Sequence, residues 1–279
     1  MNFKQLITLL FLSLVIFNCS DDDSDNTDNN EVAFTGNFFP LHLDNSWTYL
    51  VTDLNNNTNE TTVNTDLLMV ESESNTGYNL TVNQGDLANG IMSGILTSGE
   101  LSLTETTLTS NGSIQLPIEE FDFEIEIDNA LLYNTSAENE TELSSQSGTF
   151  TQDIEGYPVT INYTLSSQQL QNLESYVVNT INYQTVTSAK IALNLTASIT
   201  ITQFGISQSL PIVDSQEVLS IVSHYAKDIG LIQAEANISF SLNATILALL
   251  QQSGMDLSTL PTSLSATNTQ ILTDFNITE

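Results

Sequence analysis

The sequence predicts a mainly β fold: a curled antiparallel sheet of long strands that meander, with a half-barrel as one form of it, and one or two short helices. Apolar and polar residues alternate with a period of two over many segments, which is typical of strands with one buried face. Hydrophobic residues make up 40% of the 279, enough for one large β domain. Since neither a domain-scale repeat nor a Pro/Gly-rich linker follows residue 34, we expect residues 35–279 to form a single domain.

The longest alternating segment covers residues 181–201. Its apolar residues occupy odd positions, most residues between them are polar, and no Gly or Pro interrupts it. This pattern predicts one very long strand, or two strands joined by a bulge, so the sheet must twist and curl. The same alternation places Leu193 in the core and Asn194 on the surface.

Shorter alternating segments predict the remaining strands. In chain order these are residues 45–51, 62–70, 78–82, 121–128, 159–165 and 269–277, the last of which would close the sheet. Two hairpins are expected, one joining 91–97 to 101–108 around Ser98-Gly99-Glu100, the other joining 216–227 to 231–242 around Asp228-Ile229-Gly230. The polar segments 53–60 and 134–147 predict a turn and a long loop.

Two segments predict short helices. Residues 166–169 read Ser-Ser-Gln-Gln, which fits a capping box, and apolar residues follow at helical spacing, so we expect a helix near 167–175. Residues 245–252 are apolar on most sides and precede Gly254, a helix stop, so we expect a short buried helix there.

The N-terminal segment carries a targeting signal. Lys4 precedes an apolar run over residues 6–17, which is too short to span a bilayer and fits the core of a signal peptide. Cys19, the sole cysteine, follows this run, so no intrachain disulfide can form. The pattern resembles the signal peptide and lipobox of bacterial lipoproteins. The resemblance implies removal of residues 1–18 and a lipid on Cys19. The alternative is an ordinary signal peptide, or an uncleaved anchor, with an incidental cysteine.

An acidic segment follows the cysteine. Ser20, Asp21, Asp22 and Asp23 resemble the short signal that directs some lipoproteins to the outer face of the Gram-negative outer membrane. Residues 19–34 contain few apolar side chains and many Asp and Asn, which predicts a disordered tether.

The charge balance limits the partners. The chain has 34 Asp and Glu but 3 Lys and Arg, a formal charge of −31, which repels nucleic acid and anionic headgroups. We therefore expect no nucleic-acid partner and a membrane association through the N-terminal lipid. The composition identifies no particular protein or glycan partner.

Few residues are candidates for catalysis. His42 and His224 are the only histidines, and we expect both to be structural. Thr187-Ser188-Ala189-Lys190 has the spacing of a Ser-x-x-Lys motif, but Thr stands in place of its Ser within a predicted strand. There is no Gly-x-Ser-x-Gly elbow, no phosphate-binding glycine loop and no arginine. The sequence favours a protein that is not an enzyme and has no cofactor.

The segment 121–128 offers a candidate metal site. Its acidic residues alternate with apolar ones, so all four carboxylates share one face of a strand: Asp122, Glu124, Glu126 and Asp128. Neighbouring carboxylates of this kind could bind calcium weakly. The alternative is a solvated face without a bound ion.

Two further motifs bracket the expected domain. Phe38-Phe39-Pro40-Leu41 with Asn45-x-Trp47-x-Tyr49 resembles an entry motif of uncharacterised secreted bacterial β domains, and residues 225–231 resemble the closing motif that accompanies it, with Asp228 where that motif usually has Gly. The aromatic residues could form a sugar-binding platform, but we favour a place in the core.

Two functional hypotheses remain. The first is a surface-exposed, non-enzymatic lipoprotein that binds a partner or glycan. The second is a carrier for an apolar ligand, a lipid or a lipoprotein, within a concave sheet, by analogy with half-barrel carriers. A continuous cavity along the odd-numbered face of residues 181–201 would favour the carrier, and a filled core there would favour the first hypothesis.

Overall fold

The computed structural model describes residues 34–115, 124–154, 156–203, 206–252 and 262–278. The chain divides into two units, Met1–Asn30 and Glu31–Glu279, and all of the described residues belong to the second. None of the described helices is long and apolar enough to cross a membrane.

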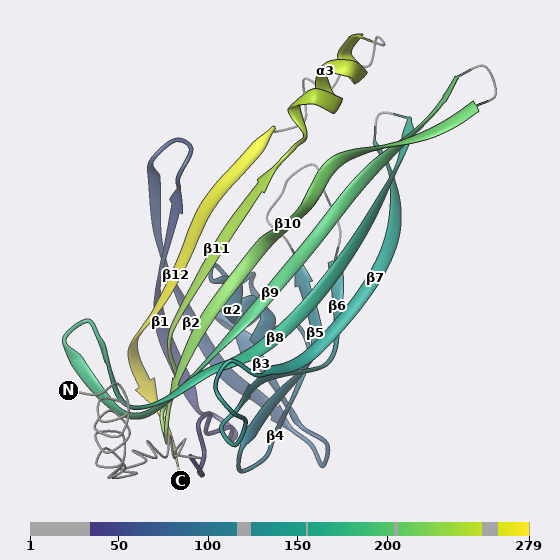
Figure 1. Cartoon of the computed structure of the whole chain (residues 1–279). Coiled ribbons are helices and arrows are strands. Elements are labelled where there is room, and N and C mark those ends of the chain that lie inside the picture. Colours follow the sequence, from purple (N-terminus) through teal and green to yellow (C-terminus); the bar gives the residue numbers. More distant parts are fainter. Residues whose placement is uncertain (1–33, 116–123, 155, 204–205, 253–261, 279) are drawn as a thin grey trace, which may run out of the picture. The chain divides into compact units, whose positions relative to one another are not determined.

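The described residues form one antiparallel sheet of 12 strands, as the alternating pattern predicts (Figure 1). Its spatial order is β6-β5-β4-β3-β2-β1-β12-β11-β10-β9-β8-β7. Strands that follow one another in sequence therefore pair, except β6 and β7, and β12 joins the two halves by pairing with β1. The strands are β1 (Ser46–Asn55), β2 (Glu60–Glu73), β3 (Tyr78–Val82), β4 (Glu100–Leu103), β5 (Thr107–Gln115), β6 (Glu124–Asn134), β7 (Glu142–Ile154), β8 (Tyr157–Val178), β9 (Ile181–Gln203), β10 (Ile206–Ala226), β11 (Gly230–Ser241) and β12 (Ser263–Asn276).

The sheet curls until its two end strands, β6 and β7, lie side by side (Figure 1). Glutamine side chains join them in place of a backbone ladder. The Gln146 amide donates to the Glu126 carbonyl and accepts from the Asp128 N–H at 3.1 Å. Gln169 of β8 likewise accepts from the Asn134 N–H at 3.0 Å. These bonds leave the sheet nearly closed.

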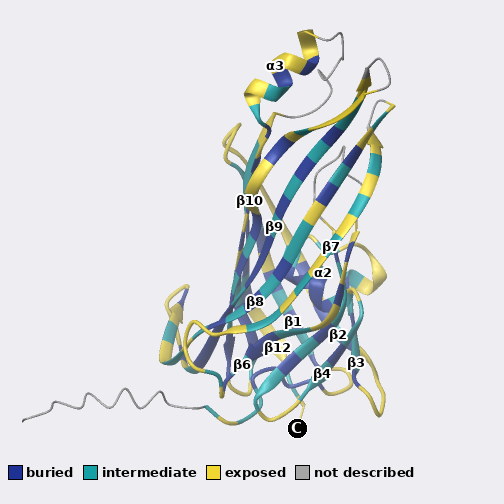
Figure 2. Cartoon of the chain, turned by 45° about the vertical axis from the view of Figure 1, so that its right-hand side comes forward, coloured by how far each residue is buried: buried dark blue, intermediate teal, exposed yellow. Residues whose placement is uncertain are grey.

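The segment predicted as one very long strand, or as two strands joined by a bulge, forms the single strand β9 of 23 residues. Buried and less buried residues alternate along its upper part (Figure 2). Near its start Thr185 has a positive φ of 54°, and the four residues after it, 186–189, are all buried, so the alternation is interrupted there. Ile181, the first residue of the strand, directly follows the turn at 179–180 and is exposed rather than in the core.

Residues 167–175 are strand rather than helix. They lie within β8, which pairs with β9 through to its last residue, and a helix would lose that ladder. The capping-box pattern arises because polar side chains point inward here: Gln169 is fully buried and its amide donates to Thr187 Oγ1 at 2.8 Å. The predicted loop at 134–147 is also wrong in its second half, since β7 begins at Glu142.

Residues 91–97 are helix rather than strand, so the hairpin expected around Ser98-Gly99-Glu100 does not form. They make α2 (Ile91–Thr97), preceded by the 3-10 turn η1 (Asn83–Gly85). The hairpin in this region instead joins β4 to β5. The second hairpin, the strand at 78–82 and the C-terminal helix α3 (Ala244–Gln252) agree with prediction, although α3 buries only Leu247 and Leu250.

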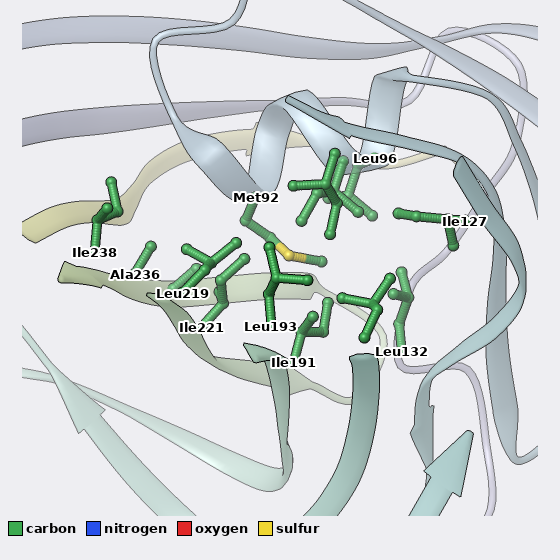
Figure 3. Packing of buried hydrophobic residues seen from close by; sticks show 14 of the residues in the cluster. Met92, Leu96, Ile127, Leu132, Ile191, Leu193, Leu219, Ile221, Ala236 and Ile238 are labelled. Atoms are coloured by element: carbon green, nitrogen blue, oxygen red, sulfur yellow. The ribbon is translucent and has the colours of Figure 1, made fainter. Parts of the chain in front are cut away.

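α2 lies against the inner face of the sheet (Figure 3). Met92 and Leu96 are buried beside Leu193, Leu219 and Ile221, which come from β9 and β10. The cavity at the nearby β6–β7 seam, which Ile191 borders, measures about 30 Å³. At this level the odd-numbered face of β9 is therefore packed.

This packing predicts the effect of a substitution in β9. Leu193 is fully buried, so Leu193→Ala removes packed methyl groups and should lower the free energy of unfolding by about 2–5 kcal/mol. Asn194 is half-buried with its side chain on the opposite face, and Asn194→Ala should change it by about 0.5 kcal/mol or less. Urea unfolding of both variants checks this; equal losses would contradict the alternation.

Candidate functional site

The entry and closing motifs pack against each other although about 180 residues separate them. Phe39 stacks on Trp47, with ring centroids 4.8 Å apart and planes 15° apart. Trp47 Nε1 donates to the Ile229 carbonyl at 2.6 Å, and the Tyr49 hydroxyl donates to the Leu231 carbonyl at 3.0 Å. The two motifs therefore form one structural cluster.

The aromatic residues of this cluster are core and not a sugar-binding platform. Phe38, Phe39, Trp47 and Tyr49 are all fully buried. Gly230 lies beneath two of their rings, and its φ of 110° is one that glycine adopts without strain. The turn before it has Asp228 at a φ of 60°, so an aspartate adopts the left-handed conformation where the motif usually has glycine.

The candidate catalytic residues do not assemble. His42 is exposed. His224 stacks on Tyr176 at a ring distance of 4.0 Å, and burial lowers its pKa to about 4 against a smaller opposing effect of Glu235. In the Ser-x-x-Lys-like segment, the Ser188 hydroxyl donates to the Gln171 carbonyl, and Lys190 forms an ion pair with Glu217 at 2.9 Å.

The acidic face of the segment 121–128 is only partly described, since Asp122 lies outside the described residues. Glu124, Glu126 and Asp128 are exposed, while Ile125 and Ile127 between them are buried, as expected. Among the described residues, no group of three or more His, Cys, Asp and Glu side chains is placed to hold a metal ion. Calcium binding stays a prediction.

A gap in the sheet creates a different candidate site. β4 is short and pairs with only Tyr78 and Asn79 of β3. In the described part of the chain, the rest of β3 and the end of β5 beyond Asn111 therefore have no strand between them. α2 packs over this gap and contacts both strands.

A groove of about 580 Å³ runs along α2 at this gap. Its apolar lining comes from β3, from the segment between η1 and α2, from α2 and from β5, and its wall includes three glycines, which carry no side chain. The apolar lining residues are Leu80, Val82, Leu87, Ala88, Ile91, Ile95 and Ile114. The volume lies within the ~300–1,000 Å³ usual for small-molecule sites.

A buried carboxylate holds the segment that forms the groove. Asp66 of β2 is fully buried and accepts four hydrogen bonds without a cation. One oxygen accepts from the Asn83 amide at 2.9 Å and from the Asn89 backbone and side chain at 3.0 and 2.8 Å; the other accepts from the Gly90 N–H at 2.8 Å. Asp66 thus connects η1 to the start of α2.

Two inward amides of β12 complete this support. Gln270 Oε1 accepts from the Met92 and Ser93 N–H groups at 2.8 and 3.1 Å, and Asn268 Oδ1 accepts from the Ile91 N–H at 3.1 Å. These N–H groups have no partner within the helix, since they belong to its first turn. Polar residues therefore point inward on β12 to cap α2.

The rim of the groove is acidic. Glu71, Asp86 and Glu124 line it, all three are exposed, and the groove has no Lys or His in its lining. Within the described residues, none of these three carboxylates accepts a hydrogen bond or pairs with a cation. The rim can therefore offer unneutralised negative charge beside an apolar surface.

Of the sequence-predicted site residues, the groove includes only Glu124. The groove could not be predicted from the sequence, because residues 91–97 have the apolar character of a strand but form a helix. Gly90 and Gly94 were the available signal, since glycine weakens a strand. No family model, no curated protein and no solved structure is significantly similar to this chain.

Proposed function

We propose that this chain is a lipid-anchored lipoprotein of the bacterial outer membrane, exposed on the cell surface, and that it binds a ligand without chemical turnover. The observation that carries the anchor is the position of Cys19, the sole cysteine, at the end of the apolar N-terminal segment. Ser20, Asp21, Asp22 and Asp23 then act as the export signal, and residues 19–34 tether the folded unit.

The geometry of the described residues supports binding rather than catalysis or transport. The histidines and the lysine considered as catalytic groups lie apart from the groove beside α2. The core around Leu193 is filled, which favours a protein that binds its ligand at the surface. The alternative, a carrier of an apolar ligand, would need a continuous cavity along β9. The groove offers a ligand an apolar surface beside exposed carboxylates.

The anchor predicts that a fatty acid becomes attached to Cys19. Cells that express the chain and take up a clickable fatty acid should label the wild type, while Cys19→Ser should lose the label and be released from the membrane fraction. The reason is that no other thiol exists in the chain to carry the lipid. In-gel fluorescence after fractionation measures both effects.

A variant with Asp21, Asp22 and Asp23 replaced by Ala serves as the control. It should keep the label, because the cysteine is intact, but should resist protease added to whole cells. Equal labelling of the wild type and Cys19→Ser would refute the anchor. Protease resistance of the wild type on intact cells would refute surface exposure alone.

A further inference from the structure

We propose that the groove beside α2 binds a small organic cation with an apolar body. This inference deepens the proposed function by naming the ligand class, but it depends on the groove and not on the lipid anchor.

The shape of the groove selects the apolar body. Its apolar lining comes from the inward residues of β3 and β5, from one face of α2 and from Leu87 and Ala88 just before that helix. Leu87 is 89% exposed at the edge, so a ligand there would cover an apolar side chain that now faces water. Removing such apolar surface from water favours binding.

The charge of the rim selects the cation. Glu71, Asp86 and Glu124 come from β2, from the residue after η1 and from β6, so they border the groove from separate elements. An anionic ligand would meet three unneutralised carboxylates in a chain with a formal charge of −31. A ligand with a positive charge and an apolar body would match both the acidic rim and the apolar lining of the groove.

Gly94 allows the groove to be filled without disturbing the fold. A Cβ at this position would meet only the Ala88 Cβ, at 3.9 Å, and the residue lies within α2. A longer side chain therefore extends into open space. Because methionine has a higher helix propensity than glycine, Gly94→Met should preserve or raise the melting temperature.

Berberine, a planar alkaloid cation whose fluorescence rises in apolar surroundings, serves as the probe. The full chain carrying Cys19→Ser is titrated, so that no attached lipid competes for the dye. We expect saturable binding, at least a tenfold loss of affinity for Gly94→Met, and a similar loss for Glu71→Gln/Asp86→Asn/Glu124→Gln. The anionic dye 1-anilinonaphthalene-8-sulfonate should bind at least tenfold more weakly than berberine.

The matched control is Glu138→Gln/Glu142→Gln/Glu235→Gln, which changes the net charge equally at exposed positions that do not line the groove. It should keep wild-type affinity. Equal losses for the two triple variants would show attraction to the overall charge and overturn the proposal. Unchanged berberine binding by Gly94→Met, or equal binding of the anionic dye, would also overturn it. Since all samples lack the lipid, these outcomes are independent of the fatty-acid labelling.

Discussion

Gly230→Ala is expected to lower the free energy of unfolding by about 2–5 kcal/mol, a large part of the ~5–15 kcal/mol of a typical domain. Two effects add. The φ of 110° is strained for a residue with a Cβ, and that Cβ would lie 2.8 Å from Phe39 Cδ2 and 3.0 Å from Trp47 Nε1. Neither ring can move away from the added Cβ easily, because both rings are fully buried and stack on each other.

Urea unfolding followed by tryptophan fluorescence measures the loss. Trp47 is the only tryptophan in the chain, so its emission reports directly on the cluster. Gly156→Ala is the matched control: its φ of 84° imposes comparable backbone strain, but nothing lies within 4 Å of its Cβ. If Gly230→Ala is no more destabilising than this control, the contact between the entry and closing motifs does not stabilise the fold.

Asp66→Ala is expected to release α2 from the sheet and to cost roughly 3–5 kcal/mol, because several donors lose their acceptor and each unsatisfied buried donor costs about 1–3 kcal/mol. Asp66→Asn should cost less, about 1–3 kcal/mol, because its amide oxygen can still accept the three bonds from Asn83 and Asn89, and only the Gly90 N–H then faces an NH₂ group. Hydrogen exchange should show early loss of protection in Ile91–Thr97 while β9 stays protected.

Asp53→Asn provides the comparison, because Asp53 accepts one hydrogen bond, from the Asn268 amide at 2.6 Å, and is only half-buried. It should cost about 1 kcal/mol. Unchanged protection of α2 in Asp66→Ala would show that the helix does not depend on this carboxylate. The groove would then have to be held by Gln270 and Asn268 alone.

The sequence alone predicted those strands in which the alternation of apolar and polar residues matches the buried and exposed faces of the sheet. In the later part of β9 and in β11 the alternation of apolar and polar residues is regular, and the turn at Asp228-Ile229-Gly230 marks the hairpin end. These elements bury one face over many residues, so local pattern and tertiary packing favour the same conformation. β3 was predicted at its observed bounds for the same reason.

The prediction of a helix at residues 167–175 was wrong because polar side chains point inward there. Gln169 and Gln270 are fully buried, although residues of this type are usually exposed. Each satisfies backbone N–H groups of another element, at the β6–β7 seam and at the start of α2. Such residues break the apolar pattern, so residues 167–175 resembled a capped helix.

By itself the sequence determined the fold class and the long strand β9, and it gave the candidate anchor at Cys19, because these depend on residues close together in the chain. Only the tertiary structure decided that residues 91–97 form a helix over a gap left by the short β4, and that the entry and closing motifs meet. Those outcomes depend on partners far apart in sequence: Asp66 and Gln270 hold α2, and Gly230 lies under Phe39. The groove and its acidic rim follow from that assembly.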